Sequence, residues 1–454
     1  MSESIHNLLI GAFGDFTDVS AETLDAARAD KSGHASSTTP IAVVSPRTVE
    51  EVQDVVRFAA RHSLPVVPRG GGSGLAGGSI AQAGEIVLST ASLNRILDVS
   101  AADRLATVEA GVINSDLNDK AKAYGLWFTP DPASRTWSTV GGNIATNAGG
   151  LMCAKYGVTR EAVLSLDVVL ANGNLVTLGH KSVKGVTGLD LAQLMIGSEG
   201  TLGIIVRATV KLAPISSHAT WTVSARFGGI DHATAACQQI IERGHSPSVL
   251  ELIDERALVL IEKHLGLSTS EVGTVLIVAQ ADGADSSETA SALAKIFHEF
   301  GASVEQKPEG EEAEALLTLR RAMHPAMEAH GSVLIEDVAI PRSKMVEMFR
   351  RIRQIESDYG VEIPTVAHAG DGNLHPNFIY NGSDVPPVIW EAAGELFRAA
   401  LELGGTLTGE HGVGLLKKRW LLDELGDEVG DLQRRIKAVF DPQNLLNPGK
   451  VFDN

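Results

Sequence analysis

Short apolar runs and helical repeats alternate near the start of this chain. Residues 41–44 and 64–67 are apolar runs that predict strands. Between them a capping box begins at Thr48, and apolar residues then recur at helical spacing as far as Ala59. We therefore expect a β-α-β unit, preceded by a helical segment and a polar loop in residues 1–40.

A cleaner alternation of strands and helices follows a predicted boundary at residues 214–218. Before it we expect strands at residues 85–88, 105–109, 164–170 and 175–178, and a helix at 114–124. Beyond it we expect strands at residues 221–227, 249–253, 274–279 and 332–340, and helices at 232–243, 257–264, 286–300, 311–328 and 343–359. The second pattern is typical of an α+β domain of ferredoxin-like character, with helices covering a sheet.

Glycine-rich stretches interrupt the first half of the chain. Gly72 to Gly77 matches GxGxxG, but a dinucleotide-binding Rossmann unit needs an amphipathic helix that opens at those glycines. Residues 75–84 have no helical pattern, so we predict a strand–loop–strand turn whose bare N–H groups form an anion-binding nest. Prolines and small residues in 130–134 and 141–150 would also bring the backbone close to a flat or anionic group.

Composition narrows the class of protein. At 454 residues the chain has room for two or three domains of roughly 150 residues, and 44% hydrophobic with 21% charged residues is ordinary for a soluble protein. A net charge of −18 disfavours nucleic acid and anionic membranes as partners, so an anionic substrate would need a local cation. Cys153 and Cys237 are too few for an iron–sulfur cluster or a disulfide framework. Without a signal peptide or a membrane-length apolar run, we expect a cytoplasmic protein with no membrane span.

The most specific candidate chemistry lies between His368 and His375. The pair Asp371 and Gly372 favours a two-residue type I′ hairpin, which would place the two histidines opposite each other on one face. Two imidazoles so placed could bind one metal ion, and Glu410 could add a carboxylate while leaving positions open for a substrate. Alternatively, the histidines only brace the fold through hydrogen bonds.

Seven stretches, in this order, resemble FAD proteins of the vanillyl-alcohol-oxidase type: residues 68–79, 130–134, 141–150, 197–204, 368–376, 409–414 and 447–452. The branch they resemble is that of the D-lactate dehydrogenases, the glycolate oxidase flavin subunit and the D-2-hydroxyglutarate dehydrogenases. The resemblance runs from about residue 39 to the C-terminus. It implies an α+β fold with a two-subdomain FAD-binding domain at 1–215, a ferredoxin-like substrate-binding cap with the His hairpin at 216–408, and a segment at 409–454 that returns to the flavin.

The resemblance also implies which residues hold FAD. The pyrophosphate would be wrapped by Arg69, Gly70, Gly71, Gly72, Ser73 and Gly74; the flavin side would be lined by Pro132, Ser134, Gly141, Gly142, Asn143 and Thr146; the adenosine side by Gly200 and Ile204; and Asn447 would return to the ring. Glycine-rich turns suit a pyrophosphate because they supply convergent N–H donors and allow close approach of the backbone. We expect non-covalent FAD, because residues 68–79 contain no His, Cys or Tyr that could attach it.

For catalysis, the resemblance implies a divalent metal on His368, His375 and Glu410, with zinc or manganese expected, although iron and cobalt also suit such ligands. His411 would be the base, and Arg320 would hold the substrate carboxylate. Relatives often have Trp where this chain has Leu317. The alternative for Arg320 is an ion pair on its own helix, which carries the acidic residues Glu311, Glu312 and Glu314.

The implied reaction oxidises a small anionic D-2-hydroxy acid, such as D-lactate or glycolate, to the 2-keto acid. Oxidation of D-2-hydroxyglutarate is the alternative within the same family. A metal-dependent hydrolase, or a catalytically silent flavin-carrier subunit, are the alternatives outside it. The chain ends without a cysteine-rich extension, so we expect a separate electron-transfer protein to take the electrons.

Overall fold

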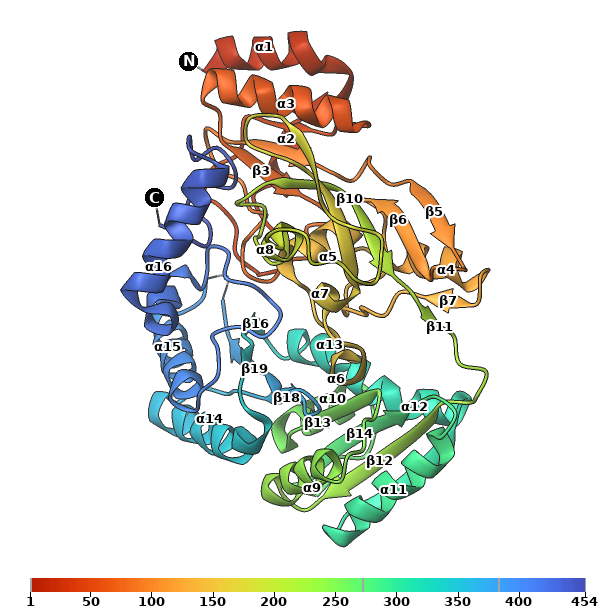
Figure 1. Cartoon of the computed structure of the whole chain (residues 1–454). Helices are drawn as coiled ribbons and strands as arrows, with labels where there is room; N and C mark the ends of the chain where they lie inside the picture. Colours follow the sequence, from red (N-terminus) through yellow and green to blue (C-terminus); the bar gives the residue numbers. More distant parts are fainter. Residues whose placement is uncertain (1, 272, 383, 454) are drawn as a thin grey trace. The chain divides into compact units, whose positions relative to one another are not determined.

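The computed structural model describes residues 2–271, 273–382 and 384–453 (Figure 1). Contacts between these residues define two compact units. Unit 1 comprises Met1–Gly150, Gly157–Ile215 and Glu410–Asn454, and unit 2 comprises Leu151–Tyr156 and Ser216–Gly409. No helix among the described residues is long and apolar enough to cross a membrane.

The first sheet of unit 1 has the order β1-β2-β4-β3, and β2 and β3 both pair with β4 in parallel. Its strands are β1 (Thr17–Asp18), β2 (Ala42–Val44), β3 (Val66–Arg69) and β4 (Ile86–Ser89), with helices α1 (Ser2–Phe13), α2 (Ala21–Ala26) and α3 (Val49–His62). The predicted capping box at Thr48 is confirmed, since Thr48 and Glu51 each accept the other's backbone N–H. The predicted strand–loop–strand turn is also confirmed, because residues 70–85 contain no helix between β3 and β4.

The second sheet of unit 1 is antiparallel, with the order β5-β6-β10-β8-β9. Its strands are β5 (Ile96–Ser100), β6 (Leu105–Glu109), β8 (Val163–Val169), β9 (Leu175–Gly179) and β10 (Ile204–Lys211), and β7 (Leu126–Trp127) pairs separately with β11 (Ala213–Pro214). The remaining α-helices of this unit are α4 (Asn114–Lys122), α5 (Val140–Thr146), α7 (Thr159–Ala162), α8 (Leu191–Met195) and α16 (Leu421–Phe440).

Helix α5 was not predicted, because residues 141–150 are mostly small and have no apolar repeat. It forms because Thr139 caps it and because Gly141 packs directly on Ala110, where a Cβ at Gly141 would lie 2.5 Å from the Ala110 Cβ. Val140 and Ile144 on the same helix are buried in the core against the second sheet. Tertiary packing therefore makes a helix of a sequence with little intrinsic helical preference.

Unit 2 contains one large antiparallel sheet with the order β15-β12-β14-β13-β18-β19-β16, and β17 also pairs with β19. The strands are β12 (Trp221–Phe227), β13 (Val249–Ile253), β14 (Val275–Ala281), β15 (Ser303–Pro308), β16 (Ser332–Ile335), β17 (Val338–Ala339), β18 (Thr365–His368) and β19 (Asn373–Tyr380). The helices are α6 (Cys153–Tyr156), α9 (Ile230–Glu242), α10 (Glu255–His264), α11 (Ser286–Glu299), α12 (Glu311–Arg321), α13 (Met323–Glu328), α14 (Met345–Tyr359) and α15 (Pro387–Glu402). The structure thus divides the predicted helix at 311–328 and the predicted strand at 332–340, and it adds β15.

Different helices pack on the two faces of this sheet. Helices α9 and α11 pack on one face, where Phe227 meets Phe297, and α10, α12 and α13 pack on the other (Figure 1). Val278 and Val366 point to the second face, where they share a core with these three helices. Side chains alternate along a strand, so the same face carries every second residue of β13, β18 and β19.

Candidate functional site

In unit 1, the glycine loop after β3 lies close against the segment that begins α5. A Cβ at Gly70 would lie 2.4 Å from the Thr139 Oγ1, and a Cβ at Gly71 would lie 2.4 Å from the Trp137 carbonyl oxygen. Gly72 has φ +68°, and Arg69 closes the loop by donating from Nη1 to the Ser79 carbonyl at 3.0 Å. Burial lowers the pKa of Arg69, and attraction to Asp30 partly offsets that effect. The loop is therefore held by contacts that only glycine permits.

Several buried polar atoms around this loop have no hydrogen-bond partner among the described residues. They are the Ser79 Oγ, the Ser138 Oγ, the Asn143 Nδ2 and the Asn447 Oδ1. Buried polar groups in proteins are nearly always paired, so an unpaired set in one unit points to a polar ligand. These side-chain donors and acceptors fit the pyrophosphate and ring edges of FAD.

Asn447 ties the C-terminal segment to this region. Its Nδ2 donates to the Gly78 carbonyl at 2.9 Å and to the Glu199 carbonyl at 2.7 Å. Its backbone N–H donates to the Val66 carbonyl at 2.8 Å. The residue predicted to return to the flavin therefore joins the end of the chain to two of the predicted cofactor loops.

Glu199 was not among the predicted site residues. It is buried, and its carboxylate accepts from the Val413 N–H at 2.7 Å and the Gly414 N–H at 2.9 Å, just after Glu410 and His411. Burial raises its pKa to about 7, although the two N–H donors and Lys417 act in the opposite direction. The sequence signal was an acidic residue inside a glycine-rich turn, at φ 51° in the structure.

Two residues predicted to line the adenosine side differ in what they can offer. Gly200 has φ +72°, and a Cβ there would lie 3.1 Å from the Pro68 side chain, so the absence of a side chain at Gly200 lets this turn pack against β3. The Ile204 side chain is buried in a core cluster with Val66 and Leu446. Any contact of Ile204 with a cofactor would therefore come from its backbone.

The remaining predicted cofactor residues lie in the segment that leads into α5 and along it. Pro132 is buried, and the Ser134 carbonyl accepts from the N–H groups of Trp137 and Ser138. Thr146 donates from Oγ1 to the Gly142 carbonyl at 3.2 Å. Their contact with FAD stays a prediction, as it does for Ser73 and Gly74.

In unit 2, the predicted pairing of the histidines is wrong in register. His368 pairs with Asn373, and His375 pairs with Val366, so the connection is a four-residue loop, 369–372. The type I′ turn fails because Asp371, unlike Gly372, does not have positive φ. The N–H groups of both turn residues donate to the His368 carbonyl instead.

The two histidines nevertheless share one face, because residues two apart on a strand point the same way. His375 lies diagonally across from His368, and their ring centroids are 4.9 Å apart with ring planes at 85°. Both are buried. The side-chain Oδ1 of Asn373, the cross-strand partner of His368, is buried without a hydrogen-bond partner among the described residues.

Glu410 is bonded directly to Gly409, the last residue of unit 2. Asp337 of unit 2 fixes the two residues that precede Glu410, because its carboxylate accepts from the Gly409 N–H at 2.7 Å and from the Thr408 Oγ1 at 2.8 Å. One ligand atom from each of His368, His375 and Glu410 lies within 4.8 Å of the other two. Two imidazoles and a carboxylate form a donor set that divalent zinc or manganese accepts. The residues thus fit a metal ion, and His411 follows next in the chain.

Arg320 does not pair with acidic residues of its own helix. Its Nε donates to the Glu251 carboxylate at 2.6 Å, whereas Arg321 pairs with Glu314. The other Glu251 oxygen lies 2.6 Å from the His368 Nδ1. Burial alone would raise the pKa of Glu251, but the attraction of His368 and Arg320 outweighs it and lowers that pKa. Glu251 was also missed, since nothing local in the sequence marks it.

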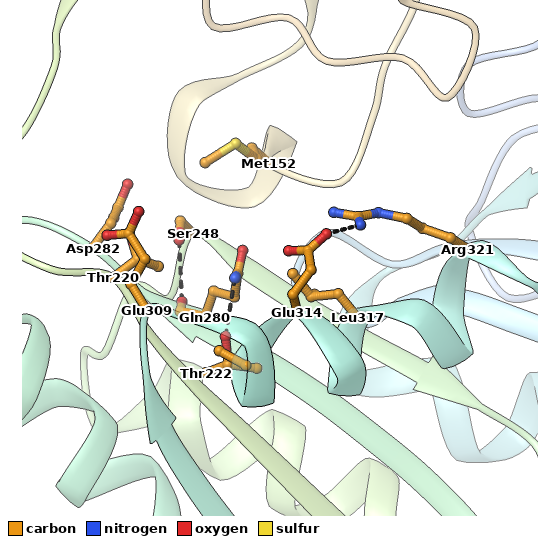
Figure 2. A pocket seen from close by; sticks show the side chains of 12 residues that line it. Met152, Thr220, Thr222, Ser248, Gln280, Asp282, Glu309, Glu314, Leu317 and Arg321 are labelled. Atoms are coloured by element: carbon orange, nitrogen blue, oxygen red, sulfur yellow. Dashed lines mark hydrogen bonds and ion pairs between the residues drawn. The ribbon is translucent and has the colours of Figure 1, made fainter.

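A cavity of about 280 Å³ opens on the same face of the unit 2 sheet, beside α12 (Figure 2). Its floor is polar, since Gln280 donates to the Thr222 Oγ1 at 3.0 Å. The residues that line it are Met152, Thr220, Thr222, Ser248, Gln280, Asp282, Glu309, Gly310, Ala313, Glu314, Leu317 and Arg321. The lining includes Leu317 but neither Arg320 nor the two histidines, so the cavity is separate from the histidine pair.

In a comparison with known proteins, two segments of the chain match family models. Residues 40–179 match the family described as "FAD binding domain", and residues 217–451 match "FAD linked oxidases, C-terminal domain". Glycolate oxidase subunit GlcD of Bacillus subtilis is 40% identical over 419 residues, which cover 91% of this chain and 89% of that protein. D-lactate dehydrogenase of Archaeoglobus fulgidus is 38% identical, covering 90% of each chain. D-2-hydroxyglutarate dehydrogenase of Xanthomonas citri pv. viticola is 35% identical, covering 91% and 89%.

Solved structures show the same fold at low sequence identity. 4-Ethylphenol oxidase from Gulosibacter chungangensis superposes with a TM-score of 0.78 at 18% identity, covering 99% of this chain and 97% of that one. An alkyldihydroxyacetonephosphate synthase superposes with a TM-score of 0.76 at 20% identity, covering 98% and 85%. The expected fold of the vanillyl-alcohol-oxidase type, with an FAD-binding domain and a second α+β domain, is confirmed.

Proposed function

This chain belongs to the FAD-linked oxidase family, in the D-lactate, glycolate and D-2-hydroxyglutarate group, and we propose that it oxidises a small D-2-hydroxy acid to the 2-keto acid. The observation that supports this most directly is in unit 2. One histidine of the buried pair, His368, and the arginine Arg320 both contact one buried carboxylate, Glu251. A 2-hydroxy acid presents complementary groups, because its carboxylate suits an arginine and its hydroxyl suits a metal held by histidines.

The cofactors and the protein would divide the chemistry between them. FAD, when bound, supplies the acceptor for the hydride of the substrate's α-carbon, and a divalent metal supplies a Lewis acid for the hydroxyl. We propose that His368, His375 and Glu410 hold the metal and that Arg320 binds the substrate carboxylate. His411 takes the hydroxyl proton on a ring nitrogen as the α-carbon loses its hydride, which leaves the C=O of the keto acid.

FAD would be held without a covalent bond by residues of unit 1. Arg69 and the glycines after it supply the loop around the pyrophosphate, and Asn143 and Asn447 offer buried amide atoms to the ring system. A separate electron-transfer protein would reoxidise the flavin. The name of the Bacillus subtilis relative, a subunit of glycolate oxidase, supports this expectation.

Anaerobic reduction of the purified flavoprotein tests the proposal. D-lactate, glycolate, D-2-hydroxyglutarate and, as the stereochemical control, L-lactate are mixed with the oxidised protein in the absence of oxygen. We expect bleaching of the flavin absorbance by a D-acid or glycolate, one keto acid per flavin, and no bleaching by L-lactate. Failure of every hydroxy acid to bleach a flavin that dithionite does reduce would contradict the proposal and favour a silent carrier. Phosphate-ester hydrolysis that continues after flavin removal would instead favour the hydrolase.

A further inference from the structure

Glu251 connects two residues of the proposed site that come from different elements. It lies on β13, directly across from His368 on β18 in the antiparallel register. Its Oε1 is 2.6 Å from the His368 Nδ1, and its Oε2 accepts from the Arg320 Nε on α12, also at 2.6 Å. Each carboxylate oxygen therefore serves one proposed functional side chain.

The contact is buried. The side chains of Glu251, His368 and Arg320 are 1%, 6% and 15% exposed. A carboxylate taken out of water is costly unless it is paired and hydrogen-bonded, and charge-assisted hydrogen bonds are shorter than neutral ones, as both of these 2.6 Å contacts are. The carboxylate thus constrains both partners strongly.

The bond to His368 determines which ring nitrogen faces the metal. A carboxylate can only accept, so the Nδ1 carries the hydrogen and the Nε2 keeps its lone pair for a metal ion. The side-chain partner of a metal-bound histidine also fixes the ring's orientation and raises its basicity. The perpendicular ring of His375, 4.9 Å away, marks the same face of the sheet.

The bond to Arg320 acts on the substrate end. Guanidinium groups carry five N–H donors in one plane, so anchoring one nitrogen orients the rest. The Arg320 Nη1 also lies 3.8 Å from the Sδ of Met323, the first residue of α13, and this contact helps to hold the plane of the guanidinium group. The orientation of the guanidinium plane would determine how the substrate carboxylate binds.

We propose that Glu251 is a positioning residue that holds His368 in the tautomer offering Nε2 to the metal and, with its other oxygen, aims Arg320 at the substrate carboxylate. This inference rests on the proposed function. It predicts that one carboxylate, which touches neither the metal nor the substrate, couples metal affinity to substrate affinity.

The test uses the FAD-loaded protein after its metal has been removed by chelation. Zn²⁺ is titrated against a competing chelator, and Co²⁺ binding is followed by its visible absorption. We expect Glu251→Gln to bind either ion roughly 10–100-fold more weakly, the range usual when the partner of a metal-bound histidine is lost. The variant should also show a changed Co²⁺ spectrum and a raised KM for the hydroxy acid at saturating metal, with unchanged flavin content.

Asp254 offers a matched control. It is also a buried carboxylate of unit 2, 1% exposed and paired with Arg353 at 2.5 Å. It caps α10 by accepting from the Ala257 N–H and also accepts from the Thr365 N–H, and none of these partners is a proposed site residue. Asp254→Asn should lower stability and leave Zn²⁺ affinity within about threefold of the wild type. Equal weakening by both variants would mean that any lost buried charge perturbs the metal site, which would overturn the positioning role.

Arg320→Met separates the two halves of the proposal. It should raise KM while leaving Zn²⁺ affinity within about threefold, because the bond from Glu251 to His368 remains. If Glu251→Gln does not fold, Glu251→Asp decides the matter, since it keeps the charge but is one methylene short of both partners. Wild-type Zn²⁺ affinity in a folded Glu251 variant would overturn the inference and leave the proposed function standing. Absence of Zn²⁺ binding by the wild type would instead refute the proposed metal site itself.

Discussion

The buried carboxyl of Glu199 makes the stability of this protein depend on pH in a defined direction. Its pKa is raised by burial from 4.5 to about 7 in the folded chain. Between these values the folded chain keeps a proton that the unfolded chain has released. The free energy of unfolding therefore falls as pH rises through this window and levels off above about 7. At about 1.4 kcal/mol for each pKa unit, this group alone accounts for roughly 3 kcal/mol.

Glu199→Gln removes this dependence, because an amide does not ionise there. The amide also places an NH₂ group, which cannot accept, against one of the two N–H groups of Val413 and Gly414, where the protonated carboxyl has a hydroxyl oxygen that still accepts. We therefore expect the variant to be roughly 1–3 kcal/mol less stable at pH 5. The deficit should shrink or reverse by pH 8. Urea unfolding of the FAD-loaded wild type and variant, followed by flavin release and circular dichroism at several pH values, measures the difference.

Glu109 supplies a control of opposite sign in the same unit. Burial would raise its pKa, but hydrogen bonds and attraction from Arg95 outweigh that and lower the pKa. Its contribution to stability is therefore present above pH 4.5 and lost as pH falls. Glu109→Gln should lose most stability, relative to wild type, at the higher pH. Parallel pH profiles for wild type and Glu199→Gln would refute the reasoning about Glu199.

Further outcomes follow from the same contacts. Replacing a metal ligand, as in His368→Ala, should abolish metal binding and hydroxy-acid oxidation while flavin content stays near one per chain; full metal occupancy in that variant would contradict the metal site. Gly372→Val should behave like a ligand variant or fail to fold, since its Cβ would lie 2.3 Å from the Ile340 carbonyl oxygen at φ +89°; wild-type metal content and activity would speak against the strained loop. Gly71→Ala should lower FAD content severalfold, because its Cβ would meet the Trp137 carbonyl at 2.4 Å, and unaltered flavin absorbance would count against that contact. Acid precipitation should release all the flavin into the supernatant, and colour left in the pellet would reveal a covalent bond.

What the sequence determined by itself is mostly local. The capping box at Thr48 could be predicted because its two hydrogen bonds join residues three apart. The helix-free loop after β3 could be predicted because glycines at 77, 78 and 84 leave no amphipathic repeat. The seven motifs, in their order along the chain, also identified the family, which the family matches confirm.

Only the tertiary structure decided how the candidate site in unit 2 is built. The four-residue loop 369–372 between β18 and β19 has contacts beyond the hairpin, including the Arg342 Nη1, which donates to the Gly370 carbonyl at 3.2 Å. The position of Gly372 against Ile340 has the same origin. Packing against the rest of unit 2 therefore outweighed the local preference of Asp371 and Gly372 for a two-residue turn. The register of β18 and β19 differs from the predicted one, but both histidines still lie on the same face of the sheet.

Glu251 shows the same limit most clearly. It lies 117 residues before His368 and 69 before Arg320, so no spacing in the sequence relates the three. In β13 it occupies a position between apolar residues, and all five residues of that strand are buried. Hydrophobic patterning reports burial but not the identity of a partner, and the partner is fixed only when β13, β18 and α12 pack together.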